Sequence, residues 1–333
     1  MTPEGPEPHR SLSAYPRDSA PIPVVANAWP AWTGWLPVLI GTIALLIALG
    51  GSVSAGSRGL ALADPRTLLA LAIGGALLLE GGLVSLALRS LRLRRHLAPE
   101  CYRGPSVLVL LVIAVVISAV VAIPFGQDAI ALFGGGEATL LGSFVLLTST
   151  QVALVAVSAL FVFLPRALAG VQLLSATAWP RSAWIGFVAG VVAWLVATGL
   201  AALATLVLQA LGVEPEPQAA EQAIAVLDPI VVIPAVVIIA PIAEEIFFRG
   251  VVFNAWLREY GVGRAMFGSA LLFALIHASL VALVPILALG LGLALVYHRT
   301  RSLLVAIVMH ATVNGISVLL ALLVRIDVIQ LPT

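Results

Sequence analysis

The chain has 333 residues, of which 61% are hydrophobic and 10% are charged, and its mean hydropathy is +1.12. Soluble globular proteins carry about 25% charged residues, so this composition excludes a water-soluble protein. It predicts an all-α, polytopic integral membrane protein. The net charge of +1 gives no support for a nucleic-acid partner. A single cysteine, Cys101, excludes both an intrachain disulfide and a metal site built from cysteines.

Residues 1–30 are rich in proline and small polar residues, and we expect them to form a disordered tail. The first apolar run begins too late and is too long for a secretory signal peptide, so it should remain as an anchor. Nine apolar runs are candidates for membrane-spanning helices. They lie at residues 35–53, 67–88, 106–123, 139–164, 183–207, 229–257, 264–281, 285–297 and 302–324.

The eighth run is short, so the pattern fits either nine spans or eight spans with a re-entrant piece around Pro285. With alternating spans, thirteen arginines lie on one side of the membrane and three on the other. The excess of arginine marks the cytoplasmic side, which predicts a multi-pass protein of the cell membrane with a cytoplasmic N-terminus. We divide the chain into the tail, N-terminal membrane helices at 31–227, a membrane core at 228–325 and a C-terminal tail at 326–333.

Before residue 240, one charged side chain stands out inside a span. Glu80 lies in a stretch that also contains Gly74, Gly75, Gly81 and Gly82. Polar side chains commonly join membrane helices through hydrogen bonds. We therefore interpret Glu80 as structural, in a bond between helices, rather than as catalytic.

After residue 240, charged and histidine residues concentrate inside the predicted spans. The sixth span holds Glu244, Glu245 and Arg249, the seventh holds His277 four residues after Phe273, and the ninth holds His310 and Asn314. A charge at the bilayer centre costs roughly 2.5–3.5 kcal/mol on insertion scales. Three charges within six residues therefore predict a functional site.

Helical spacing suggests how the first set is arranged. Residues four apart share a helix face, so Glu245 should pair with Arg249. Glu244 points about 100° away and is left free for chemistry. Pro241 removes a helical hydrogen bond just before this pair, which would kink or open the helix.

The polar residues of the other spans lie at similar predicted depths. At about 1.5 Å per residue, Glu244 and His277 lie roughly 20 Å from the inner loops, His310 about 12 Å and Asn314 about 18 Å. His310 and Asn314 share a face because they are four residues apart. We expect the four side chains to meet in one polar layer.

Such a site has the parts needed to hydrolyse an amide inside the membrane. A free carboxylate such as Glu244 is a general base for water. Imidazoles can ligate a metal, hold a water or donate to an oxyanion, and the amide of Asn314 can stabilise an oxyanion. A His-Glu-x-x-His motif is absent, so the chain is not a standard zincin.

Three motifs in this order, Glu-Glu-x-x-x-Arg, Phe-x-x-x-His and His-x-x-x-Asn, resemble one known family. It is the CAAX-processing and bacteriocin-processing (CPBP) intramembrane protease family, abortive-infection-like and related to type II CAAX prenyl endopeptidases. The resemblance covers roughly residues 228–325. The stretch 297–303 is also similar, except that Arg301 stands where we expect glycine in a turn.

The resemblance implies an all-helical catalytic core that uses a glutamate-activated water without a covalent intermediate. Glu244 would be the base and His277 would help hold the water. His310 and Asn314 would form the oxyanion side, while Glu245 and Arg249 would support the architecture.

Members of this family are usually classed as metalloproteases, which implies zinc or another divalent metal and no organic cofactor. The candidate ligands are Glu244, His277 and His310. A ligating Glu244 could not freely serve as base. The implied partner is a membrane-associated peptide or protein within the lipid bilayer. The residues leave open whether the substrate is prenylated, and they leave the oligomeric state open.

Two other functions fit the same residues. A non-proteolytic membrane scaffold or bacteriocin-immunity protein could keep this fold. A proton-coupled transporter could use Glu244 and His277 as a relay, although the chain has no clear internal repeat.

Overall fold

The computed structural model describes residues 29–58, 65–128, 138–168, 179–212, 227–277, 279–326 and 328. Nearly all of these residues are helical, and none of them forms a strand. Residues 1–28 of the expected tail, the loop at 213–226 and most of 326–333 lie outside the described residues.

Seven helices in the described part of the chain are long and apolar enough to cross a membrane, and two shorter apolar helices accompany them. The protein is thus an all-α, polytopic membrane protein, as its composition predicts. The first half comprises α1 (Trp32–Arg58), α2 (Pro65–Arg94), α3 (Val107–Ala122) with η1 (Ile123–Phe125), α5 (Leu140–Ser158) with η2 (Ala159–Phe163), and α6 (Trp179–Ala210). The second half comprises one long interrupted span, α8 (Pro229–Val232), η4 (Ile233–Ile239), α9 (Ala240–Glu245), η5 (Ile246–Phe253) and α10 (Asn254–Tyr260), followed by α11 (Val262–Leu275), α12 (Leu280–Thr300) and α13 (Leu303–Arg325).

Near the C-terminus, the seventh predicted span forms the short helix, whereas the sequence suggested that the eighth would be short. Helix α11 has 14 residues, whereas α12 has 21 and runs through Pro285. Helix α11 ends at Leu275 and α12 begins at Leu280, where the Ser279 hydroxyl accepts a hydrogen bond from the Ala282 N–H at 3.2 Å and caps the helix. A serine cap is a local polar signal that a search for apolar runs does not detect.

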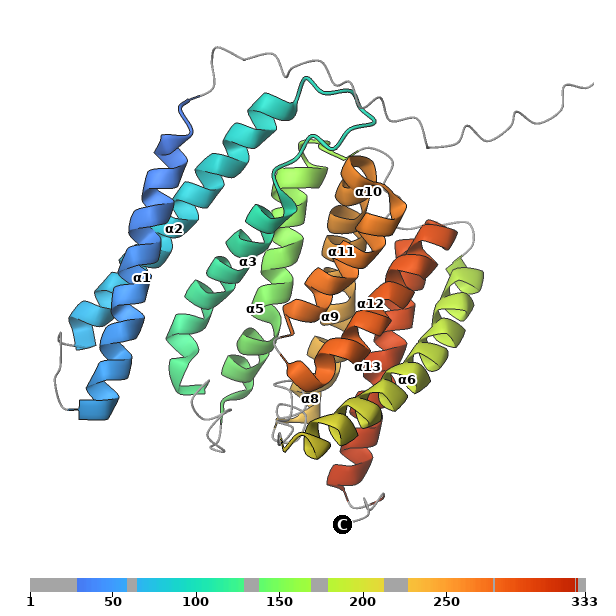
Figure 1. Cartoon of the computed structure of the whole chain (residues 1–333). Helices are drawn as coiled ribbons and strands as arrows, with labels where there is room; N and C mark the ends of the chain where they lie inside the picture. The colour runs from blue at the N-terminus through green and yellow to red at the C-terminus, as the bar shows by residue number, and fades with distance from the viewer. Residues whose placement is uncertain are drawn as a thin grey trace, which may run out of the picture.

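Helices α1 and α2 form a hairpin at one edge of the molecule, and α6 lies at the opposite edge (Figure 1). Glycines allow the two helices of the hairpin to approach closely. A Cβ at Gly41 would lie 2.5 Å from the Gly75 carbonyl oxygen, and one at Gly82 would lie 2.6 Å from the Gly34 carbonyl oxygen. Small residues at such crossings are typical of membrane helices, which gain from close packing.

Glu80 does not make the expected bond between helices through its buried oxygen. Its Oε2 atom has no hydrogen-bond partner. The hairpin is held by backbone contact at glycines, as the neighbouring Gly75 and Gly82 show, so no polar link is required there.

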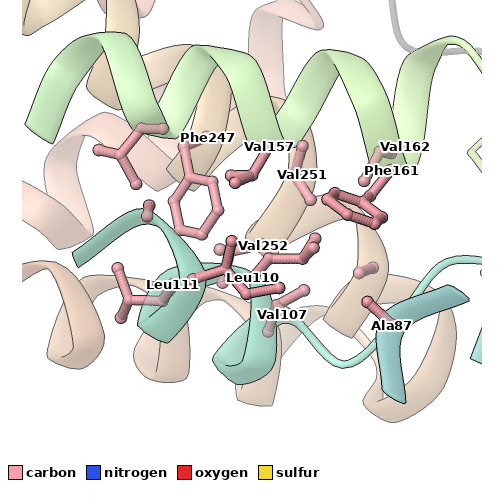
Figure 2. Close-up of a cluster of buried hydrophobic side chains, with 14 of the residues drawn as sticks. Ala87, Val107, Leu110, Leu111, Val157, Phe161, Val162, Phe247, Val251 and Val252 are labelled. Atoms are coloured by element: carbon pink, nitrogen blue, oxygen red, sulfur yellow. The ribbon is translucent and has the colours of Figure 1, made fainter. Parts of the chain in front are cut away.

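A buried apolar cluster surrounds the interrupted span. Phe247, Val251 and Val252 of η5 are fully buried. Figure 2 shows them between α3, which contributes Leu110, and α5, which contributes Val157. This packing fixes the segment that follows the two adjacent glutamates.

Helix α13 is held from the other side by α6. A Cβ on Gly186 would lie 2.7 Å from the Val305 carbonyl oxygen, and one on Gly190 would lie 2.7 Å from the Met309 carbonyl oxygen. The Gly-x-x-x-Gly spacing lets two helix backbones touch. It therefore sets the position of His310, the residue after Met309.

Candidate active site

The two glutamates end a short α-helical piece between two π-helical segments. Helix α9 has six residues, Ala240–Glu245, preceded by η4 with seven and followed by η5 with eight. Proline lacks an N–H, and Pro234 and Pro241 both lie in this stretch, which agrees with the expected opening of the helix. π-Helical turns are rare and occur frequently at functional sites.

Two asparagines bind backbone carbonyls of these π segments. The Asn254 amide nitrogen donates to the Arg249 carbonyl at 2.7 Å and to the Gly250 carbonyl at 3.3 Å. The Asn314 amide nitrogen donates to the Val236 carbonyl at 2.9 Å. All three bonds satisfy backbone carbonyls in a membrane-spanning segment, where lipid offers no hydrogen-bond donors.

Glu245 is the centre of a fully buried polar network. Its Oε1 atom accepts a hydrogen bond from Arg249 Nη1 at 2.8 Å, so the ion pair expected from the spacing is present. The same oxygen accepts a bond from His310 Nδ1 at 2.9 Å. Arg249 Nη2 also donates to the Gly290 carbonyl at 3.1 Å. Three helical segments, η5, α12 and α13, are thereby tied to one carboxylate.

Glu244 is buried but has an unengaged oxygen. It is 8% exposed, and its Oε2 atom has no hydrogen-bond partner. This oxygen lies 3.9 Å from His310 Nε2. Because His310 Nδ1–H donates to Glu245, Nε2 is the ring nitrogen that faces Glu244.

Phe273 brings the two histidines to one place. Its ring centroid lies 4.9 Å from that of His277 and 5.6 Å from that of His310. The guanidinium of Arg249 lies 4.8 Å from the same centroid. His277 Nδ1–H donates to the Phe273 carbonyl at 2.7 Å, which directs the other nitrogen, Nε2, away from its own helix. The Phe273 ring of the Phe-x-x-x-His motif thus contacts both histidines and Arg249.

The structure therefore gathers Glu244, Glu245, Arg249 and His310 directly, and His277 through the Phe273 ring. The amide nitrogen of Asn314 donates to the Val236 carbonyl and not to any of these side chains. One amide hydrogen remains for another acceptor.

The side chains do not form the three-ligand metal site that the family resemblance implies. Among the described residues, no three His, Cys, Asp or Glu side chains converge in a way that could hold a metal ion. Glu244 and His310 supply two donor atoms near each other. Catalytic zinc sites use three protein ligands, so the arrangement of these residues does not fit a catalytic zinc ion.

Two features of the site were missed or underestimated from the sequence. Asn254, whose amide nitrogen also bonds the Tyr297 hydroxyl at 2.7 Å, is a polar residue inside a span and could have been noted for that reason alone. The turn at Arg301 is left-handed, with φ 53° and ψ 27°. Glycine adopts this conformation without strain. The residue is an arginine where glycine was expected, but the turn has the left-handed backbone that glycine would adopt.

Fold and site together define an all-helical membrane protein with a buried acid–base cluster in its C-terminal third. Residues 226–316 match the family model described as type II CAAX prenyl endopeptidase Rce1-like. A protein of Bacillus subtilis (strain 168) named "Putative membrane peptidase YdiL" is 33% identical over 102 residues, which cover 29% of this chain and 42% of that protein. No solved structure shows significant similarity.

These matches support the resemblance of residues 226–316 to the CAAX-processing and bacteriocin-processing membrane protease family. The matched residues 226–316 include all six predicted site residues, from Glu244 to Asn314. The chain spans less than half the length of the relative it matches.

Proposed function

We propose that the protein is an intramembrane endopeptidase that hydrolyses a peptide bond of a membrane-associated peptide or protein. One observation carries the proposal. Two adjacent buried glutamates have different partners. Glu245 is bound through Oε1 to Arg249 and His310, whereas Glu244 only lies 3.9 Å from His310 Nε2, and Oε2 of each carboxylate has no hydrogen-bond partner. A buried, unengaged carboxylate beside an imidazole is suited to general-base catalysis.

In the proposed reaction, Glu244 Oε2 removes a proton from a water molecule, and the water oxygen attacks the carbonyl carbon of the scissile bond. His277 Nε2 accepts a hydrogen bond from the same water and orients it. The carbonyl becomes an oxyanion, which accepts hydrogen bonds from protonated His310 Nε2 and from the remaining amide hydrogen of Asn314. The proton held by Glu244 passes to the leaving nitrogen as the carbon–nitrogen bond breaks, which regenerates the carboxylate.

Glu245 acts in this scheme by holding His310. Its carboxylate accepts the Nδ1 proton at 2.9 Å and stabilises a positive charge on the ring. Arg249 in turn compensates the charge of Glu245. The two residues are positioning residues, since neither has to touch the substrate.

The substrate is proposed from the family match and from the depth of the site. The matched family is described by prenylated CAAX substrates, and a prenyl-anchored tail is one form of membrane-associated peptide. A cytoplasmic N-terminus is proposed from the arginine distribution of the loops. It would place the arginine-rich ends of the helices, and entry of such a tail, on the cytoplasmic side.

A comparison of membrane proteomes tests the proposal. Cells that carry the wild-type protein should contain protein fragments that disappear in cells with Glu244→Ala. Glu80→Ala is the matched control, because it removes a carboxylate from another span and should leave the fragments in place. An immunity or assembly phenotype that survives both Glu244→Ala and His310→Ala, with no fragment lost, would instead support the non-proteolytic function.

A further inference from the structure

The C-terminal end of α2 reaches beyond the hydrocarbon part of a bilayer. The helix has 30 residues, or about 45 Å at 1.5 Å per residue, whereas a bilayer core is about 30 Å thick. Arginines begin at Arg89 and continue with Arg92 and Arg94. These last turns are therefore placed in the headgroup region, at the same end of the molecule as α10 (Figure 1).

One face of α2 is covered by α1 and then becomes uncovered. Leu79, Gly82 and Leu86 lie along this face, and a Cβ on Gly34 of α1 would lie 2.6 Å from Leu86 Cγ. Helix α1 begins at Trp32, so the helix covers this face of α2 no further than that level. Residues at the same helical phase further along α2 then line a hollow of about 220 Å³. Its lining residues are Leu86, Arg89, Ser90, Leu93, Arg94 and Leu97.

Two arginines line the hollow, Arg89 and Arg94, and Arg89 is the one available to bind a ligand. Arg89 Nε donates to the Trp29 carbonyl at 3.0 Å, which fixes the guanidinium and leaves four further N–H bonds on that group. Arg94 is already engaged, since it donates to the Gly104 carbonyl at 3.0 Å and forms an ion pair with Glu259 at 2.7 Å.

The surroundings add positive charge. Residues 89–103 contain five arginines and one glutamate, and Glu259 adds a second negative charge, which leaves an excess of three positive charges. Arg92 also lies 4.4 Å above the Trp29 ring, and tryptophan is typical of the membrane interface.

We propose that this hollow binds the phosphate headgroup of an anionic membrane lipid. Arg89 would bind the phosphate through two N–H groups, a geometry suited to guanidinium. The Ser90 hydroxyl would add a hydrogen bond, and the leucine side chains would contact the glycerol and the upper part of the acyl chains. Basic pockets at the membrane surface bind such headgroups. The proposal is independent of the proteolytic function.

Native mass spectrometry of the full-length protein in dodecyl maltoside tests the site with dioleoyl-phosphatidylglycerol as the probe and dioleoyl-phosphatidylcholine as its neutral counterpart. Arg89→Gln should weaken phosphatidylglycerol binding roughly tenfold or more, because a charge-assisted hydrogen bond is lost. Ser90→Phe should weaken it to a similar extent, since it fills the hollow and keeps every arginine. Arg95→Gln is the matched control, because Arg95 is exposed and lies outside the hollow on the same arginine-rich end.

Equal losses in Arg89→Gln and Arg95→Gln would overturn the proposal, since they would indicate diffuse attraction by surface charge. Equal retention of the two lipids by the wild type would also overturn it. A third arm adds sodium phosphate to the lipid-bound protein. Release of the lipid by millimolar phosphate would assign the site to a free anion and not to a lipid. Melting temperatures of all variants show whether each one folds. If Arg89→Gln does not fold, the result for Ser90→Phe decides the test.

Discussion

Glu244 and Glu245 are neighbours in sequence, but their surroundings give them different chemistry. Glu245 is fully buried and is bound through Oε1 by a guanidinium and an imidazole, whereas Glu244 only approaches His310 Nε2 at 3.9 Å; Oε2 of each carboxylate has no hydrogen-bond partner. Taking a charge into a low-dielectric interior is costly, and the cost is offset only by a well-placed partner. We therefore propose that Glu245 serves structure and that Glu244 is the carboxylate that takes a proton.

Removal of Arg249 should be far more costly than removal of a partly exposed arginine. Arg249→Met leaves Glu245 buried without its cation and is expected to lower the free energy of unfolding by about 3–5 kcal/mol. Arg94→Met is the matched control, because its pair with Glu259 is partly exposed, and it should cost about 0–1 kcal/mol. Denaturant titration in detergent micelles measures both. Similar small losses in the two variants would contradict the buried network.

Metal removal should have little effect on cleavage. Glu244 and His310 bring two donor atoms together, and a catalytic zinc takes three protein ligands. Cleavage of a reconstituted substrate should therefore stay within about twofold after treatment with a chelator. Loss of activity on chelation, with recovery on addition of zinc, would show that His277 moves to complete a ligand set.

At the scale of helices, local relations were predictable and long-range ones were not. The pair of Glu245 with Arg249 followed from a separation of four residues on one helix. The bond from His310 to the same glutamate spans 65 residues, and it depends on how α13 is rotated against α9. π-Helical turns shift the angular phase of a helix, so ideal spacing could not give that rotation. The engagement of Asn314 at the Val236 carbonyl was missed for the same reason.

The contact of α6 with α13 should be sensitive to a single methyl group. A Cβ on Gly190 would lie 2.6 Å from Thr312 Cβ and 2.7 Å from the Met309 carbonyl oxygen. Gly190→Ala is expected to cost about 1–3 kcal/mol of stability through overpacking, and to reduce cleavage by displacing His310. Gly199→Ala on the same helix is the control, since nothing lies within 4 Å of its added Cβ. Equal melting temperatures of the two variants would contradict the close contact.

At the scale of the whole molecule, composition was sufficient to predict an all-helical membrane protein, and the motifs predicted the family that residues 226–316 match. Nine apolar runs correspond to nine helical segments in the described part of the chain, although the short one was misplaced. Hydropathy reports how many helices there are. It does not report which helices lie side by side, because that depends on contacts such as those between the glycines of α1 and α2.

The single cysteine offers a direct test of orientation. Cys101 is free and partly exposed, in the arginine-rich connection after α2. With a cytoplasmic N-terminus, a membrane-impermeant maleimide should label it in inverted vesicles and not in intact spheroplasts. Leu211→Cys in a Cys101→Ser background is the control and should show the opposite pattern, because Leu211 is exposed near the end of α6. Labelling of Cys101 in intact spheroplasts would reverse the topology.

The central claim is that Glu244 is the general base. The most direct measurement is the cleavage rate of a substrate identified from the proteome comparison, with wild-type, Glu244→Gln and Glu80→Gln proteins reconstituted in the same lipid. We predict that Glu244→Gln lowers the rate by about 10²–10⁴-fold without a fall in melting temperature, and that Glu80→Gln retains the wild-type rate. A Glu244→Gln protein that cleaves as fast as the wild type would contradict the account.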